Sequence, residues 1–218
     1  MDINKLTTFK VPFLSKTDID AKADNFRNVY WKNKEVPVNV EDIIEKELKL
    51  TIIPENGIND AIEGVNAYIS KDFKKITVEY NQYMNDETGN RLRFSFAHEL
   101  GHLVLHKDIY SEFNFNDIDE YKNLIENIPE EQYDFIEYQA NEFAGRLIVP
   151  LNKLKEEISK YKEDIKEYVK AFPDKPENRD SNYLLERISS IICHVFGVPR
   201  IVIEIRINRE KIDLYKII

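Results

Sequence analysis

Apolar residues recur every three or four positions over much of the chain, the spacing that places them on one face of an α-helix. The stretches with this spacing are 18–35, 40–48, 91–106, 129–149, 151–172 and 182–196. Thr17 or Asp18 is the expected N-cap of the first helix. Asn39 and Ser181 have the side chains to cap two others, and Gly197 suits the end of the last. Helices therefore dominate the expected fold.

A different pattern lies between the second and third of these helices. Residues 50–53, 62–69 and 75–80 are short apolar runs, and the last two alternate between apolar and polar positions. Turn-forming residues separate the runs. We expect an α+β fold, mostly helical, with a small antiparallel sheet of about three strands packed on the helix 91–106.

The C-terminal part of the chain contains the best candidate for a domain boundary. Residues 173–180 are hydrophilic and include two prolines, which is typical of a linker. We predict a domain over 1–172, a linker over 173–180 and a helical appendage over 181–218. Residues 201–207 leave two possibilities, because isoleucine at every second position suits a strand whereas Glu204 and Arg206 also fit a short helix.

Composition narrows the classes of protein to consider. The chain has 218 residues, 42% of them hydrophobic and 33% charged, which is typical of a globular protein with one sizeable core. It has no long apolar run and no signal segment at its start, so we expect no membrane span and a cytoplasmic location. The single cysteine, Cys193, allows no internal disulfide and lies among apolar neighbours. The formal net charge of -9 argues against direct binding of nucleic acid.

The helix 91–106 carries a candidate metal site. His98 and His102 are four residues apart, so their imidazoles lie on one helical face and can bind the same ion. Glu99 lies beside that face and is placed to act as the general base on a water molecule, as metallohydrolases require. A buried helix that carries two histidines by chance is the alternative explanation.

A catalytic zinc site has three protein ligands, so a further ligand must come from elsewhere in the chain. On the helix 129–149, Glu137 and Asn141 share one face, and small neighbours such as Ala140 allow a close approach to the first helix. We predict that Glu137 binds the metal and that Asn141 hydrogen-bonds a ligand histidine. Glu142 points away from that face and is expected to be solvated; a loop carboxylate remains the alternative ligand.

His106 continues the four-residue spacing but is not expected to bind the same ion. On one helix it lies about 12 Å along the axis from His98, whereas ligands of a single ion lie within about 4 Å of one another. Orienting a ligand, capping the helix or lining the cleft are the expected roles. The donor that stabilises a developing oxyanion is not identified; Arg91, Arg93, His106 and the tyrosines are the candidates.

Residues 108–137 contain ten acidic residues and one basic residue, Lys122. Such a run usually forms a solvated surface. Alternatively, an acidic rim near the metal site attracts a basic substrate, such as a DNA-binding protein.

Residues 91–106 and 137–150 together resemble the ImmA/IrrE family of bacterial and phage metallopeptidases. The resemblance spans about 38–150 and continues weakly over 188–207. It implies a zincin-like domain in which the residues matching His98, His102 and Glu137 hold Zn²⁺ and the residue matching Glu99 is the catalytic base. It also implies a cytoplasmic endopeptidase that cleaves a helix-turn-helix repressor of a mobile element, stress-response locus or toxin-antitoxin-like locus. Comparison with family members around Pro199 favours a helix for 201–207.

Two functions remain in competition. The first is a zinc-dependent endopeptidase whose partner is a protein substrate, a DNA-binding repressor. The second is a regulatory metal-binding protein that controls a repressor by binding it, through the acidic rim or the apolar stripe of 151–172. A structural metal site would normally have four protein ligands, and a chain with 4 histidines and 1 cysteine offers few. This scarcity favours an open, catalytic site.

Overall fold

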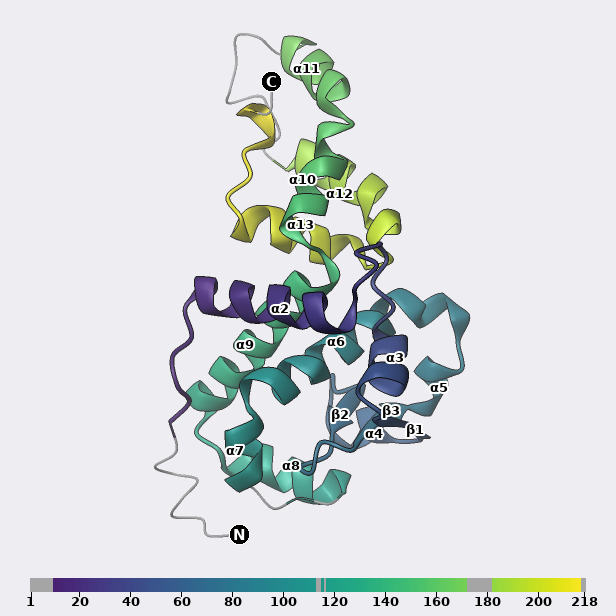
Figure 1. Ribbon diagram of the computed structural model, residues 1–218, viewed down its shortest axis with the longest axis vertical. Coiled ribbons are helices and arrows are strands. Elements are labelled where there is room, and N and C mark those ends of the chain that lie inside the picture. The colour runs from purple at the N-terminus through teal and green to yellow at the C-terminus, as the bar shows by residue number, and fades with distance from the viewer. Residues whose placement is uncertain (1–9, 113–114, 116, 172–181, 217–218) are drawn as a thin grey trace.

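The computed structural model describes residues 10–112, 115, 117–171 and 182–216. Two long helices lie side by side at its centre, α6 (Gly89–Leu105) and α9 (Glu130–Ile148). A third, α2 (Lys16–Tyr30), crosses them on one side (Figure 1). Phe96 and Leu100 of α6 and Phe143 of α9 are fully buried, and Phe26 of α2 packs edge-on against the Phe143 ring. This buried interface fixes the position of every side chain that α6 and α9 direct at each other.

Gly101 allows α6 and α9 to approach closely. A Cβ atom at this position would lie 3.0 Å from both the Cα and the carbonyl oxygen of Ala140, which are backbone atoms that cannot move aside. The two helices therefore approach closely at Ala140, as expected, and the approach is possible because Gly101 has no side chain.

Gly101→Ala is accordingly expected to destabilise the protein by about 1–3 kcal/mol, the usual cost of forcing extra atoms into a packed interior. Gly89→Ala is the matched control, because a Cβ at this other α6 glycine would meet no atom within 4 Å. Urea denaturation of both variants measures the difference. Equal midpoints for Gly101→Ala and the unaltered protein would show that the helices are not in contact at this point.

The sheet has three strands, as expected, but it is mixed. Strands β1 (Thr51–Glu55), β2 (Ala67–Ile69) and β3 (Lys75–Glu79) lie in the order β1-β3-β2. β3 pairs with β2 antiparallel and with β1 parallel. The prediction of a wholly antiparallel sheet is wrong because β3 returns between the other two strands, and alternation along a strand does not specify its neighbour. β2 is buried and contacts α6, so the sheet packs on that helix as expected.

Short elements connect and cover this core. They are α3 (Val40–Asp42), η1 (Ile43–Glu47), α4 (Ile58–Ala61), α5 (Tyr80–Tyr83), η2 (Asp86–Thr88), α7 (Lys107–Glu112) and α8 (Ile118–Asn127). The predicted cap Asn39 is confirmed, since its side chain accepts a hydrogen bond from the Asp42 amide at 3.1 Å. The cap of α2 is Ser15 rather than Thr17 or Asp18. Ser15 and Asp18 accept each other's backbone N–H groups, a reciprocal capping box.

The remaining helices form the upper part of Figure 1. They are α10 (Leu151–Ser159), α11 (Lys162–Ala171), α12 (Tyr183–Phe196), α13 (Arg200–Arg209) and the 3-10 turn η4 (Leu214–Lys216). The prediction of a single helix over 151–172 is wrong, because the helix is interrupted at Lys160 and Tyr161. Gly197 adopts the left-handed conformation expected at a helix end, and 201–207 are helical.

Residues 173–180 and Ser181 lie outside the described residues, so the domain division remains a prediction.

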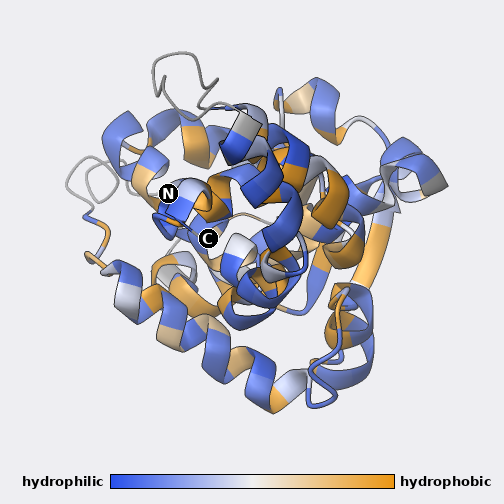
Figure 2. Ribbon diagram, turned by 90° about the horizontal axis from the view of Figure 1, so that it is seen from above, coloured by the Kyte–Doolittle hydropathy of each residue, from blue (hydrophilic) through white to orange (hydrophobic). Residues whose placement is uncertain are grey.

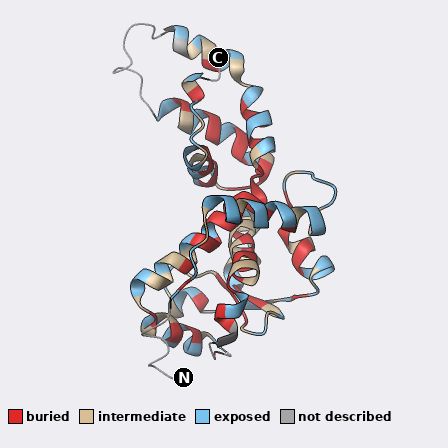
Figure 3. Cartoon of the chain, turned by 60° about the vertical axis from the view of Figure 1, so that its left-hand side comes forward, coloured by how far each residue is buried: buried red, intermediate tan, exposed pale blue. Residues whose placement is uncertain are grey.

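Hydropathy follows this packing. Figure 2 shows helices with hydrophobic residues on one side and hydrophilic residues on the other, and Figure 3 shows buried residues concentrated where helices face one another. Cys193 is buried, as its neighbours predicted. Within the described ranges, no helix alone has the length and apolar character to cross a membrane; α12 and α13 meet that test only as a pair bent by 111°.

Candidate metal centre

Two imidazoles and one carboxylate converge between α6 and α9. The Nε2 atoms of His98 and His102 lie 2.9 Å apart. The Glu137 carboxylate, from α9, lies 3.0 Å from Nε2 of His98 and 3.5 Å from Nε2 of His102. Ligand atoms at about 2 Å from a tetrahedral ion are roughly 3.3 Å apart, so the three groups have the spacing that one metal ion requires.

The Glu99 carboxylate is near this point but is held by the sheet. Its ligand oxygen and the two imidazole nitrogens all lie within 4.8 Å of one another, which also makes Glu99 a conceivable ligand. However, its Oε2 accepts a hydrogen bond of 2.7 Å from the backbone N–H of Ile69 at the end of β2. The Glu137 carboxylate lies 3.0 and 3.5 Å from the two Nε2 atoms, so the prediction that Glu137 is the third ligand and Glu99 the general base fits this geometry.

Asn141 orients the first imidazole. Its Oδ1 lies 3.0 Å from Nδ1 of His98. An amide oxygen can only accept, so Nδ1 of His98 carries a proton, and Nε2 is the nitrogen that a metal ion would bind after displacing any proton there. Asn141 lies one helical turn beyond Glu137 on α9, which places both side chains at the same ring, as the sequence predicted.

A chain of hydrogen bonds orients the second imidazole. Nδ1 of His102 lies 3.0 Å from Nδ1 of His106, and Nε2 of His106 lies 3.1 Å from Oε1 of Gln139. The Gln139 amide then donates to the carbonyl of Pro12 at 2.9 Å. Because that carbonyl can only accept, each donor along the chain is determined, and His102 donates from Nδ1 while its Nε2 stays unprotonated. His106 thus lies behind the site and does not reach its centre.

The site attracts positive charge. Burial works to lower the pKa of His98, but the hydrogen bond and the negative charge of Glu137 outweigh it and raise this pKa to about 9. Burial and the neighbouring histidines lower the pKa of His102, and burial lowers that of His106 to about 4, so both rings are neutral at pH 7. A dication between the rings would experience the same attraction.

Burial raises the pKa of Glu99 to about 8, although the His98 charge and the Ile69 N–H oppose this rise. Its carboxyl group is therefore close to the point at which it exchanges a proton near neutral pH, which suits a general acid or base.

We expect Gln139→Leu to weaken zinc binding by about 10- to 100-fold, the usual effect of removing a group that orients a metal ligand. Leucine fills the space but cannot accept the His106 proton, so His106 is free to present the wrong nitrogen to His102. Gln139→Glu retains an acceptor and should bind zinc more tightly than Gln139→Leu. Competition with a fluorescent zinc chelator measures both variants. Equal zinc affinities would exclude an orienting role for Gln139.

His98, Glu99 and Glu137 line a cleft of about 290 Å³, and His102 lies behind them. The Glu137 side chain is 25% exposed and that of His98 14%, whereas that of His102 is 1% exposed. Tyr121 of α8, Tyr133 of α9 and the segment 64–67 before and within β2 form the rim.

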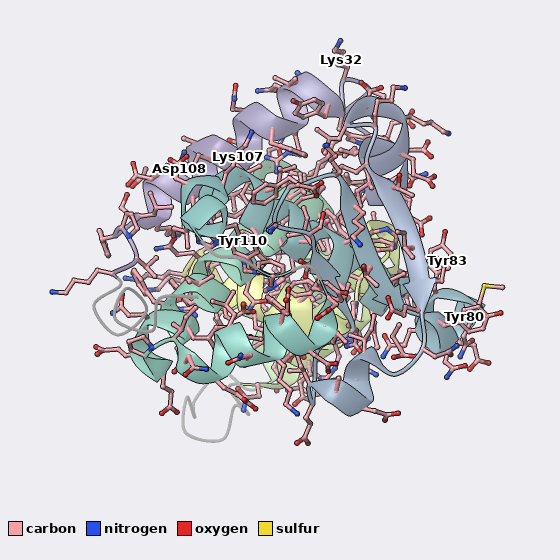
Figure 4. All side chains as sticks on the ribbon, turned by 90° about the horizontal axis from the view of Figure 1, so that it is seen from below. Lys32, Tyr80, Tyr83, Lys107, Asp108 and Tyr110 are labelled. Atoms are coloured by element: carbon pink, nitrogen blue, oxygen red, sulfur yellow. The ribbon has the colours of Figure 1, made fainter. Side chains whose placement is uncertain are left out.

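An aromatic group closes the other side of the site. Tyr110 of α7 is buried, with its ring centre 5.2 Å from that of His102. Figure 4 shows Tyr110 toward the interior, whereas Lys107 and Asp108 of the same helix lie nearer the outside. Of the described cavities, the largest, about 980 Å³, lies between α2 and the start of α10 and contains none of the predicted site residues.

The structure brings together all six residues that the sequence singled out, His98, Glu99, His102, His106, Glu137 and Asn141. Their catalytic and metal-binding roles remain predictions. Of the other oxyanion candidates, Arg93 donates to the Gly197 carbonyl, and Arg91 lines a groove beyond the cleft, so neither lies in it.

The expectation that Glu142 is solvated is wrong. It is buried, pairs with Arg146 on its own helix, and lies 3.0 Å from Arg209 of α13. Sequence reasoning also missed Gln139. The sequence showed only that Gln139 is a polar residue between Glu137 and Asn141. The structure adds that it is buried and hydrogen-bonded to His106.

Comparison with known proteins agrees with this geometry. Residues 80–208, more than half of the chain, match the family described as the IrrE N-terminal-like domain, peptidase M78. A comparison with curated proteins gives no significant match. The matched region includes α6, α9 and the side chains of His98, Glu99, His102 and Glu137. The chain belongs to the IrrE N-terminal-like family of metallopeptidases.

Proposed function

We propose that the protein is a zinc-dependent endopeptidase that cleaves a helix-turn-helix repressor. The observation that carries the enzymatic part is the convergence of two imidazole Nε2 atoms and the Glu137 carboxylate at an open cleft, with the Glu99 carboxylate beside them. Two nitrogens and one oxygen are a donor set that suits zinc. A zinc ion held there would polarise the scissile carbonyl and make water acidic enough to lose a proton near neutral pH.

The chain's own residues supply the proton transfers. Glu99, fixed by the Ile69 N–H, takes the proton from the attacking water through Oε1 and then gives it to the departing amine. Asn141 and the His106–Gln139 pair keep the two ligand rings in one tautomer and orientation. Tyr133 lies one helical turn before Glu137 and lines the cleft. Burial raises its pKa, so the phenol stays protonated and can donate to the carbonyl oxygen.

The proposed substrate class comes from the family resemblance, and the charge of the cleft supports it. Seven residues on α8, its cap and the first turns of α9 are exposed carboxylates: Asp117, Asp119, Glu120, Glu126, Glu130, Glu131 and Asp134. This acidic surface borders the cleft at Tyr121 and Tyr133. A protein with a basic DNA-binding surface would be attracted to it, most strongly at low salt.

The test is to incubate the zinc-loaded protein with the helix-turn-helix protein encoded beside its gene and to follow the products by mass spectrometry. We expect a single cut that a chelator blocks and added zinc restores. An intact repressor in a stable complex would instead favour control by binding. Absence of both cut and complex would exclude this repressor as a partner.

A further inference from the structure

A second cavity continues from the metal-site cleft along α13. It has a volume of about 490 Å³ and lies between α13, the second half of α9 and the start of α6. Four residues line both it and the cleft: Asn66, Phe94, Ser95 and Asn141. Asn141 also hydrogen-bonds the ligand His98. Because the two cavities share these lining residues, the groove lies directly beside the cleft, where a polypeptide held at the metal site would meet it.

The groove is lined by large apolar side chains that are exposed to water. Ile201 and Ile205 lie one helical turn apart on α13 and are 54% and 46% exposed, and Tyr138 of α9 is 39% exposed. Of the ten exposed large hydrophobic residues in the described part of the chain, these three line this one groove. Their clustering beside a candidate active site indicates a place for an apolar side chain of the substrate.

The groove also carries an uncompensated positive charge, although the chain as a whole is acidic. Arginines 91, 146, 206 and 209 line it. Glu142 pairs with Arg146 and Arg209. Arg146 also pairs with Asp20, and Arg206 pairs with Glu210. Arg91 is exposed and has no carboxylate of its own among the groove residues. The charge left to interact with a ligand is that of Arg91.

We propose that this groove is the subsite that selects the substrate sequence on one side of the scissile bond. It takes a leucine, isoleucine, methionine or aromatic side chain against Ile201, Ile205 and Tyr138, with a neighbouring carboxylate of the substrate against Arg91. This inference rests on the proposed peptidase function. The two charged parts of the substrate would then lie on different sides of the metal site. Its acidic residue would lie at Arg91 in the groove, and its basic residues would lie toward the acidic surface of α8.

A charge reversal tests the preference. The zinc-loaded full chain is given a positional-scanning library of internally quenched peptides. We expect the unaltered protein to prefer an acidic residue beside an apolar one, and Arg91→Glu to reverse that preference to a basic residue, with a change of about tenfold or more in relative kcat/KM. A misfolded variant would lose activity without reversing preference. Arg187→Glu, an exposed charge reversal on α12 outside the groove, should leave the preference as it was.

Binding gives a measurement that does not depend on cleavage. Two labelled polyalanine decapeptides, one with leucine-aspartate at its centre and one with leucine-lysine, are titrated by fluorescence anisotropy against the zinc-loaded Glu99→Gln chain. The aspartate peptide should bind more tightly, and adding Arg91→Glu or Ile205→Ser should weaken it while Ile191→Ser on α12 does not. Equal affinities, or no binding of either peptide, would overturn the subsite. Absence of any cleavage together with the expected binding would count against the peptidase function alone.

Discussion

Glu99→Gln is expected to lower kcat for peptide cleavage by about 10²- to 10⁴-fold, the usual contribution of a general acid–base group. The glutamine oxygen can still accept the Ile69 N–H, so the fold and the histidine ligands are retained. The amide cannot take a proton from water. Zinc content should therefore stay near one ion per chain, measured by metal analysis beside the rate of cleavage.

Glu79→Gln is the matched control for this variant. Glu79 is also buried, and its carboxylate accepts the backbone N–H of Ile58 at 2.9 Å, yet it lies outside the cleft. It should retain activity. Cleavage by Glu99→Gln at the rate of the unaltered protein would remove Glu99 from the mechanism, whatever its distance from the metal ligands.

Glu137→Ala is expected to have the largest effect on the metal. It leaves two protein ligands in place of three, so zinc affinity should fall by more than the roughly 100-fold that loss of a merely orienting group can cause. Cleavage should fall with it at any zinc concentration below the new Kd. Competition with a fluorescent chelator measures the affinity.

Asp134→Ala removes the same charge from the same helix at an exposed position, so it controls for the general electrostatic attraction of zinc. It should change zinc affinity little. If Glu137→Ala bound zinc as tightly as Asp134→Ala does, Glu137 would not be a ligand, and Glu99, which the described residues group with both rings, would be the next candidate.

The sequence was sufficient for the features that depend on local spacing. His98 and His102 are four positions apart, as are Glu137 and Asn141, so helical periodicity alone assigned each pair to one face. A catalytic metal needs a further ligand beside the two histidines, and the face of Glu137 and Asn141 made Glu137 the candidate; its carboxylate does lie beside both rings. Gly197 and Asn39 were recognisable as caps because each fills a backbone requirement within a few residues.

Features that depend on contacts between distant segments could not be predicted in this way. The parallel pairing of β1 with β3 depends on where the chain returns, and the two strands carry no mark of their partner. The burial of Glu142 depends on Arg209, which belongs to a helix nearly seventy positions later. Gln139 acquires its role only through the rotation of α9 relative to α6, which brings it to His106. The apolar spacing continues across Lys160, so it predicted one helix where the structure has two. The spacing of apolar residues gives no indication of where a helix ends.

A crystal structure of the zinc-loaded protein, with anomalous data collected at the zinc absorption edge, would show directly whether His98, His102 and Glu137 bind one ion. We expect one strong peak about 2.0–2.2 Å from Nε2 of His98, Nε2 of His102 and a carboxylate oxygen of Glu137, with its remaining side open to the cleft. A peak enclosed by four protein ligands, or one from which Glu137 is absent, would contradict this expectation.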